Sequence, residues 1–270
     1  MYVMHDRPDI ARTTRDLSQD LAGPAYGALK RLKRCARYMS GTKDLKLWCP
    51  QGPHGDQLEV YTDSDWARDP RTRKSVSSVV VVWGGFIIMT LVRGQGAIAL
   101  SSCEAETYAI ASGLSEAIGI RTALEFLGSG QLSIRVRSDA SAALAVTQRQ
   151  GAGRIRHLSA KVMWVQQAVR QSLCKMLKIS THCNLADMGT KPLELKIFLE
   201  LRRALGLVSE VPLPTQKSLQ GIYSQVGMSK EEIANETTVD IESMVQSISK
   251  DGSKVEAVLK LISMIDARGR

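Results

Sequence analysis

The chain has 270 residues, 44% of them apolar and 23% charged, which is ordinary for a globular protein with a sizeable buried core. Its formal net charge of +9 favours a polyanionic partner, nucleic acid first. Five cysteines without a Cys-x-x-Cys pair argue against a disulfide framework or zinc site, and no apolar run is long enough for a signal peptide or membrane span, so we expect an intracellular protein of the cytoplasm or nucleus.

The first fifth of the chain is predicted to be helical. Residues 8–40 hold two segments with apolar residues at helical spacing, and Gly23-Pro24 separates them. The polar face of the second segment carries a basic cluster of Lys30, Arg31, Lys33, Arg34 and Arg37. This cluster is either a surface that binds a nucleic-acid backbone or an ordinary solvated face.

From residue 57 the pattern changes to strands. The runs at 57–65, 75–85 and 86–100 are separated by short turns, and the third includes a loop or bulge near 94–96, so they indicate an antiparallel meander. Residues 101–128 then form a long helix, which Ser101 or Ser102 caps.

The remainder alternates between strands and helices. We expect a strand running into a helix over 132–150, a helix over 155–173, a short strand over 174–180 and a helical segment over 184–207 that breaks at Pro192. Residues 208–270 are predicted to be a linker and a partly helical tail of unknown role. The order β-β-β-α-β-α-α-β-α predicts an α/β fold with one mixed sheet and antiparallel strands at one edge.

Four acidic residues occupy places where ligand sites form. Asp63 and Asp139 end strands, and Glu106 and Asp187 lie near helix starts. If the four converge, they cannot all stay ionised without counter-charge. Two Mg²⁺ ions would supply that charge and could clamp the attacking water and the leaving oxygen of a phosphodiester. The alternative is that these acids only cap helices and solubilise strand ends.

The residues of five segments favour the metal site over this alternative. "YTDSDWARDPRTRKSVSS", "ALSSCEAETYAIASGLSEAIGIRTALEFLG", "IRVRSDASAALAV", "RIRHLSAK" and "NLADMGTKPL" occur in this order. Together they resemble the ribonuclease H domain of copia-type (Pseudoviridae) retrotransposon Pol polyproteins. The segment from Arg7 to Leu47 resembles the end of the preceding reverse transcriptase, and the whole resemblance covers about residues 5 to 205.

The resemblance implies a ribonuclease H-like fold with a five-stranded mixed sheet. It also implies three regions: a helical end of a reverse transcriptase over 1–50, a ribonuclease H-like domain over 55–207 and the tail over 208–270. The implied reaction is hydrolysis of the RNA strand of RNA–DNA hybrids during reverse transcription, with two Mg²⁺ ions or with Mn²⁺. The rest of a reverse transcriptase is an implied partner, and no membrane is expected. Polymerase activity is not supported, because the Tyr-x-Asp-Asp turn of polymerases is absent.

By the same resemblance, the metal ligands and catalytic residues are Asp63, Glu106, Asp139 and Asp187. Asp63 would bridge both ions, Asp187 would hold the ion that activates water, and Glu106 would hold the ion near the leaving 3′-oxygen. Asp65 and Glu104 are second choices. The residues expected to bind substrate are Arg154, Arg156, His157 and Lys191.

The sequence departs from the family pattern at several positions. Ser78 stands where glycine is usual, and Gly189 stands where an apolar residue is usual.

Two other functions stay open: an inactive remnant that binds nucleic acid through the basic cluster, and an integrase-like nuclease or transposase on the same fold. Trp66 and Trp83 are expected in the core.

Overall fold

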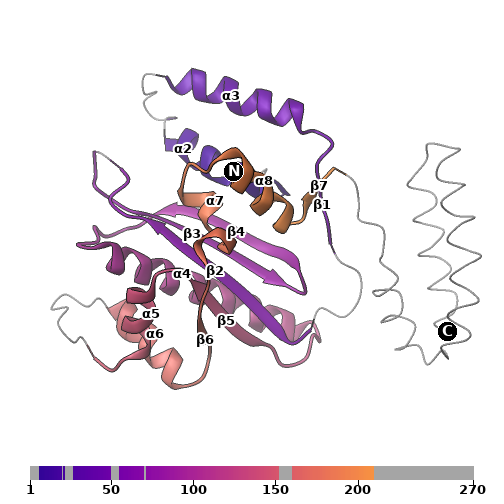
Figure 1. Ribbon diagram of the computed structural model, residues 1–270. Helices are drawn as coiled ribbons and strands as arrows, with labels where there is room; N and C mark the ends of the chain where they lie inside the picture. Colours follow the sequence, from indigo (N-terminus) through magenta and orange to yellow (C-terminus); the bar gives the residue numbers. More distant parts are fainter. Residues whose placement is uncertain are drawn as a thin grey trace, which may run out of the picture. The chain divides into compact units, whose positions relative to one another are not determined.

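A five-stranded mixed sheet lies at the centre of the structure (Figure 1). The computed structural model describes residues 6–19, 21, 27–49, 55–69, 71–151 and 160–209. The strands are β2 (Gln57–Asp65), β3 (Val76–Trp83), β4 (Phe86–Gly94), β5 (Ser133–Ser138) and β6 (Lys175–Lys178). Their order is β4-β3-β2-β5-β6, with β2, β3 and β4 antiparallel and β2, β5 and β6 parallel. This is the ribonuclease H-like arrangement, so the predicted fold class is confirmed.

Local sequence explains the antiparallel half of this sheet. The turn between β3 and β4 is Gly84-Gly85, and both glycines have positive φ, as a tight hairpin turn requires. The first part of β2 alternates between the two faces: Leu58 and Val60 are fully buried, whereas Glu59 and Tyr61 are half-buried on the other side. The period of two therefore fixes which residues face the larger core.

Three helices cover one face of the sheet. They are α4 (Ser102–Phe126), α5 (Ser141–Gln148) and α6 (Ala160–Arg170), and Figure 1 shows them together below the strands. Helix α4 lies close to β2 because it carries Gly113 at the contact. A Cβ atom at that position would lie 2.8 Å from Cγ2 of Thr62 and 3.0 Å from Cγ1 of Val60. The close approach brings the start of α4 to the end of β2.

The opposite face is covered by α2 (Ala11–Gln19), α7 (Asp187–Thr190) and α8 (Leu195–Ala204), with the short 3-10 turns η1 (Pro8–Ile10) and η2 (Thr181–Cys183). Val80 and Ile87 of the sheet pack there against Met188, Leu201 and Leu205. A smaller cluster joins Ala11 of α2 to Val76 and Val92. The N-terminal region thus packs directly on the sheet.

The predicted basic helix is α3 (Ala28–Gly41), which lies beside α2 and has no buried residue among its described positions. Its end is held by the buried Asp9, whose side chain pairs with Arg7 at 2.8 Å and accepts a hydrogen bond from Tyr38 Oη at 2.5 Å. The Tyr38 ring also packs edge-to-face on Phe198 of α8. These contacts connect the first helices to the last one.

The structure also holds a two-stranded antiparallel sheet of β1 (Lys46–Leu47) and β7 (Leu207–Val208), which the sequence analysis did not predict. All described residues lie in one compact unit, Met1–Val211. The predicted tail falls outside the described residues from position 210 onward. Within the part of the chain that the structure describes, no helix is both long and apolar enough to span a membrane.

Candidate active site

Three of the four predicted acids come together at one edge of the sheet. Each of Asp63, Glu106 and Asp139 offers a carboxylate oxygen, and these oxygens lie within 4.8 Å of one another. Asp63 lies near the end of β2, Asp139 directly follows β5, and Glu106 lies in the second turn of α4. Because β2 and β5 are parallel neighbours, their carboxyl ends meet at the same edge.

The fourth acid, Asp187, is joined to this group by a lysine. The ammonium group of Lys191 lies 3.0 Å from Oδ1 of Asp63 and 3.1 Å from Oδ1 of Asp187. Asp187 opens α7, and Lys191 follows the last residue of that helix, so the two side chains lie one turn apart on the same side. Asp187 therefore belongs to the site, although it lies outside the group of three.

Hydrogen bonds fix the orientation of these carboxylates. The Thr190 hydroxyl donates to Oδ2 of Asp63, and the Ser64 backbone N–H donates to Oε1 of Glu106 at 3.2 Å. The Thr181 hydroxyl donates to Oδ2 of Asp139 at 2.8 Å. Neighbouring elements of the fold thus hold each acid in place before any ligand binds.

Burial changes the proton affinity of the site. Desolvation, with the nearby charge of Asp63, raises the pKa of Glu106 to about 8 and that of Asp187 to about 7. Burial also raises the pKa of Asp63, against the opposing charge of Lys191. For Lys191, burial lowers the pKa, but Asp63 and Asp187 outweigh it and raise the pKa overall. A bound cation would offset the desolvation that disfavours the ionised form of these carboxylates.

The donor set fits a hard divalent cation. All the candidate ligands are carboxylate oxygens, which Mg²⁺ and Mn²⁺ prefer. Oε2 of Glu106 is buried and has no hydrogen-bond partner among the described residues. A buried acceptor without a partner is costly, and a bound cation beside it would remove that cost.

The two second-choice acids have other partners. Asp65 pairs with Arg68 at 2.8 Å, and Glu104 accepts hydrogen bonds from the Leu100 N–H and the Tyr108 hydroxyl. Glu104 thus helps to fix the N-terminus of α4. The Glu104 backbone N–H also donates to the Ser101 hydroxyl, which caps the helix. Neither acid belongs to the group around Asp63.

The residues expected to bind substrate are only partly described. Arg154, Arg156 and His157 lie outside the described residues. Lys191 is described, and its ammonium group pairs with two of the acids.

The expectation that Trp66 lies in the core is wrong. Trp66 is 47% exposed, because the turn after β2 directs it outward, and its Nε1 donates to the Ala99 carbonyl at 2.9 Å. Trp83 is half-buried against the core, as expected.

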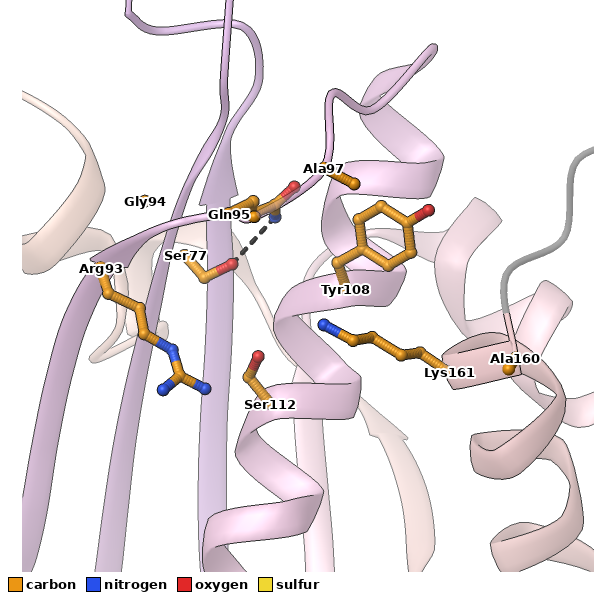
Figure 2. Close-up of a pocket in the computed structure, with 10 residues that line it drawn as sticks. Ser77, Arg93, Gly94, Gln95, Ala97, Tyr108, Ser112, Ala160 and Lys161 are labelled. Atoms are coloured by element: carbon orange, nitrogen blue, oxygen red, sulfur yellow. Dashed lines mark hydrogen bonds between the residues drawn. The ribbon is translucent and has the colours of Figure 1, made fainter.

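A cavity of about 650 Å³ lies beside the site, between β3, β4, α4 and the start of α6 (Figure 2). Arg93 and Lys161 point toward it from opposite sides, and Tyr108 and Ser112 of α4 lie between them. Gln95 closes one end, and its amide nitrogen donates to the Ser77 hydroxyl at 2.9 Å. No local pattern of residues predicts this cavity, because its lining comes from four separate segments.

Comparison with known proteins identifies the family. The chain is 29% identical over 214 residues to the retrovirus-related Pol polyprotein from transposon RE2 of Arabidopsis thaliana, an alignment that covers 78% of this chain. It is 31% identical over 211 residues to the one from transposon TNT 1-94 of Nicotiana tabacum, which covers 77% of this chain. The chain belongs to the family of copia-type retrovirus-related Pol polyproteins. It spans only 15% and 16% of the length of these two Pol polyproteins.

Membership of the Pol family confirms the resemblance seen in the sequence, although no protein-family model matches the chain. Among solved structures, the N-terminal ribonuclease H domain of rv2228c from Mycobacterium tuberculosis is similar with a TM-score of 0.36 and 12% identity, covering 56% of this chain and 99% of that one. LC11-RNase H1 in complex with an RNA/DNA hybrid has a TM-score of 0.33 and 19% identity, covering 47% and 88%. The order and direction of the strands carry the fold assignment for this Pol segment.

Proposed function

We propose that this chain is the ribonuclease H part of a Pol polyprotein and hydrolyses the RNA strand of RNA–DNA hybrids with divalent metal ions. The observation that carries the proposal is the meeting of Asp63, Glu106 and Asp139 within 4.8 Å. The family resemblance implies the same three acids as metal ligands. The family membership supports the proposal, since reverse transcription produces such hybrids.

The four acids offer two positions for cations. Asp63, Glu106 and Asp139 surround the first, and Asp63 and Asp187 flank the second. When bound, two Mg²⁺ ions would activate the attacking water and stabilise the leaving oxygen. Asp63 is shared between the positions, and the Thr190 hydroxyl and the Ser64 N–H hold Asp63 and Glu106 in orientation for this role.

Basic residues near the site are suited to hold the substrate. Arg93 and Lys161 face the cavity beside α4. The α4 residues that line this cavity, Tyr108 and Ser112, lie within two turns of Glu106 on the same helix. Phosphate contacts by such residues position a nucleic acid and make binding weaker at high salt. We include Arg154, Arg156 and His157 in the proposed substrate surface on the resemblance alone. A 2′-hydroxyl beside the scissile phosphate would distinguish RNA from DNA.

The direct test is cleavage of a labelled RNA–DNA hybrid with Mg²⁺ and with chelator. The wild-type chain should cut the RNA strand only with metal. Asp63→Asn should abolish cleavage, because it removes the shared carboxylate. Asp65→Asn is the matched control: it removes a carboxylate of the same strand that pairs with Arg68, and it should keep most of the activity.

A second candidate function is binding without cleavage, and the basic cluster of α3 favours it. Lys30, Lys33, Arg34 and Arg37 are all exposed along this helix. A remnant of this kind would bind hybrids in a salt-sensitive way and cut none. Wild-type chain that binds the hybrid but leaves the RNA intact, where a control ribonuclease H cuts, would favour this second function. Equal cutting of DNA duplex and hybrid would instead favour the integrase-like reading.

A further inference from the structure

The ammonium group of Lys191 lies between two acids of the site, Asp63 and Asp187. It lies at nearly equal distance, 3.0 and 3.1 Å, from carboxylate oxygens of Asp63 and Asp187. Both partners are deeply buried, with 1% and 4% of their side chains exposed, whereas 36% of the lysine side chain is exposed. The lysine therefore reaches from the surface into a site formed by buried acids.

The backbone favours this placement of the Lys191 side chain. Lys191 directly follows α7, and its N–H donates to the Asp187 carbonyl at 3.0 Å, which continues the helical turn. Residues four apart on a helical turn lie side by side, so Lys191 is directed to Asp187. The Thr190 hydroxyl binds Oδ2 of Asp63 and leaves Oδ1 to the lysine. Both oxygens of Asp63 thus have a partner.

The other half of the site is different. Glu106 has a buried oxygen without a partner among the described residues, and Lys191 does not contact Glu106 or Asp139 in any recorded ion pair of the described chain. Unsatisfied ligand capacity therefore lies on the side of Glu106 and Asp139. The side of Asp187 already has its counter-charge.

We propose that Lys191 is a tethered cation that holds the position between Asp63 and Asp187 while no substrate is bound. The substrate-free site then accepts one divalent ion, beside Glu106 and Asp139, and the second position opens only when Lys191 moves away. This rests on the proposed function, and it adds an order of events to it. An ammonium group and a divalent cation cannot share the same two oxygens, because like charges only about 3–4 Å apart repel strongly in a partly buried site.

A substrate phosphate is the group suited to draw the lysine out. Its negative charge would pair with the partly exposed ammonium group as the nucleic acid settles on the site. The released oxygens of Asp63 and Asp187 would then be open as ligands. Lys191 is in this account a positioning residue: it keeps the two aspartates at a fixed separation and couples metal occupancy to substrate binding.

The test counts Mn²⁺ ions bound to the full chain without nucleic acid, by calorimetric titration and by the electron paramagnetic resonance of free Mn²⁺. Wild-type chain should bind one ion. Lys191→Met, which keeps an unbranched side chain of nearly the same length but removes its charge, should bind two, with the second at least about tenfold tighter than any second ion in the wild type. Lys191→Arg keeps the charge and should remain at one.

Thermal unfolding in chelator establishes that each variant is folded before the titration. If Lys191→Met unfolds without metal, the number of Mn²⁺ ions that the wild-type chain binds still tests the proposed role of Lys191. If substrate-free wild type binds two ions with the same affinities as Lys191→Met, the proposed role of Lys191 is overturned. Hybrid cleavage by the same protein would still support the proposed function. A wild-type chain that binds no Mn²⁺ and cuts no hybrid would overturn both.

Discussion

Gly189 of α7 lies directly against Ser78 of β3. A Cβ atom on Gly189 would lie 2.8 Å from Cβ of Ser78 and 2.7 Å from Cγ2 of Val92, closer than side-chain atoms approach in folded proteins. Both positions are among those at which the resemblance implies a departure from the family pattern, Ser78 with a residue larger than usual and Gly189 with a smaller one. The two departures meet in space and complement each other in size.

We therefore expect Gly189→Ala to lower the free energy of unfolding by about 1–3 kcal/mol through overpacking. Ser78→Gly should restore part of the loss in the double variant, because it removes the nearest side chain and a hydroxyl that is buried without a partner among the described residues. Denaturant unfolding of the four proteins measures the coupling. Gly119→Ala, in open space on α4, is the control and should not destabilise. Additive effects at positions 78 and 189 would contradict the pairing.

Glu106 should make metal-free stability depend on pH. Its pKa rises from 4.5 to about 8 on folding, so the folded chain holds a proton that the unfolded chain releases. The stabilisation is fully present below pH 4.5 and is lost as pH rises through about 8, for a total on the order of a few kcal/mol. Asp187, with a pKa of about 7, adds to the same trend.

Thermal unfolding in chelator should thus show a melting temperature that falls between about pH 5 and about pH 8. Glu106→Gln should reduce the slope of melting temperature against pH, because glutamine carries no proton equilibrium. Added Mg²⁺ should raise stability most at high pH, where the carboxylates are charged. A melting temperature that is independent of pH in chelator would show that Glu106 stays ionised when folded.

Arg68 connects α2 to the site. It pairs with Asp65 at 2.8 Å and with Asp16 of α2 at 3.0 Å, and it donates to the Thr190 carbonyl at 3.4 Å. Since the Thr190 hydroxyl orients Asp63, Arg68→Gln should lower kcat for hybrid cleavage by about tenfold with little change in KM. Arg71→Gln, on an exposed side chain, is the control for lost positive charge. A rise in KM alone would instead make Arg68 a substrate contact.

The N-terminal region should be required for the stability of the sheet domain. Ala11 covers Val76 and Val92, and β1 pairs with β7, so a chain that starts at residue 55 exposes apolar surface and loses a strand partner. We expect that chain to unfold at a lower temperature than the 270-residue protein. Equal melting temperatures would establish the predicted boundary near residue 50 as a true domain boundary.

A single substitution tests the same attachment. Asp9→Ala removes a buried carboxylate that binds Arg7 and Tyr38, and it should cost about 3 kcal/mol, because it leaves the half-buried charge of Arg7 without its partner. Asp44→Ala, at an exposed position, should cost little. Chemical unfolding compares the two. Equal, small effects would mean that the Asp9 cluster does not hold the first helices.

Periodic patterns in the sequence were enough to predict most elements. The strands β2 to β5 and the helix α4 are long enough to show alternation, helical spacing or a cap, so their places could be predicted before the structure. The sheet of β1 and β7 could not be predicted, since each strand has two residues and no period. The exposure of Trp66 could not be predicted from local pattern, because it depends on a turn in which Ala67 takes a φ of 50°.

Residue type and local spacing were enough to predict the order of strands and helices along the chain, the family resemblance and which acids to consider. Three findings came from the folded structure alone: the meeting of Asp63, Glu106 and Asp139, the pairing of Lys191 with Asp63 and Asp187, and the close contact of Gly189 with Ser78. Each of these depends on distances between side chains from segments far apart in the chain. Such distances are set by how helices pack on the sheet, and no local pattern of residues records them.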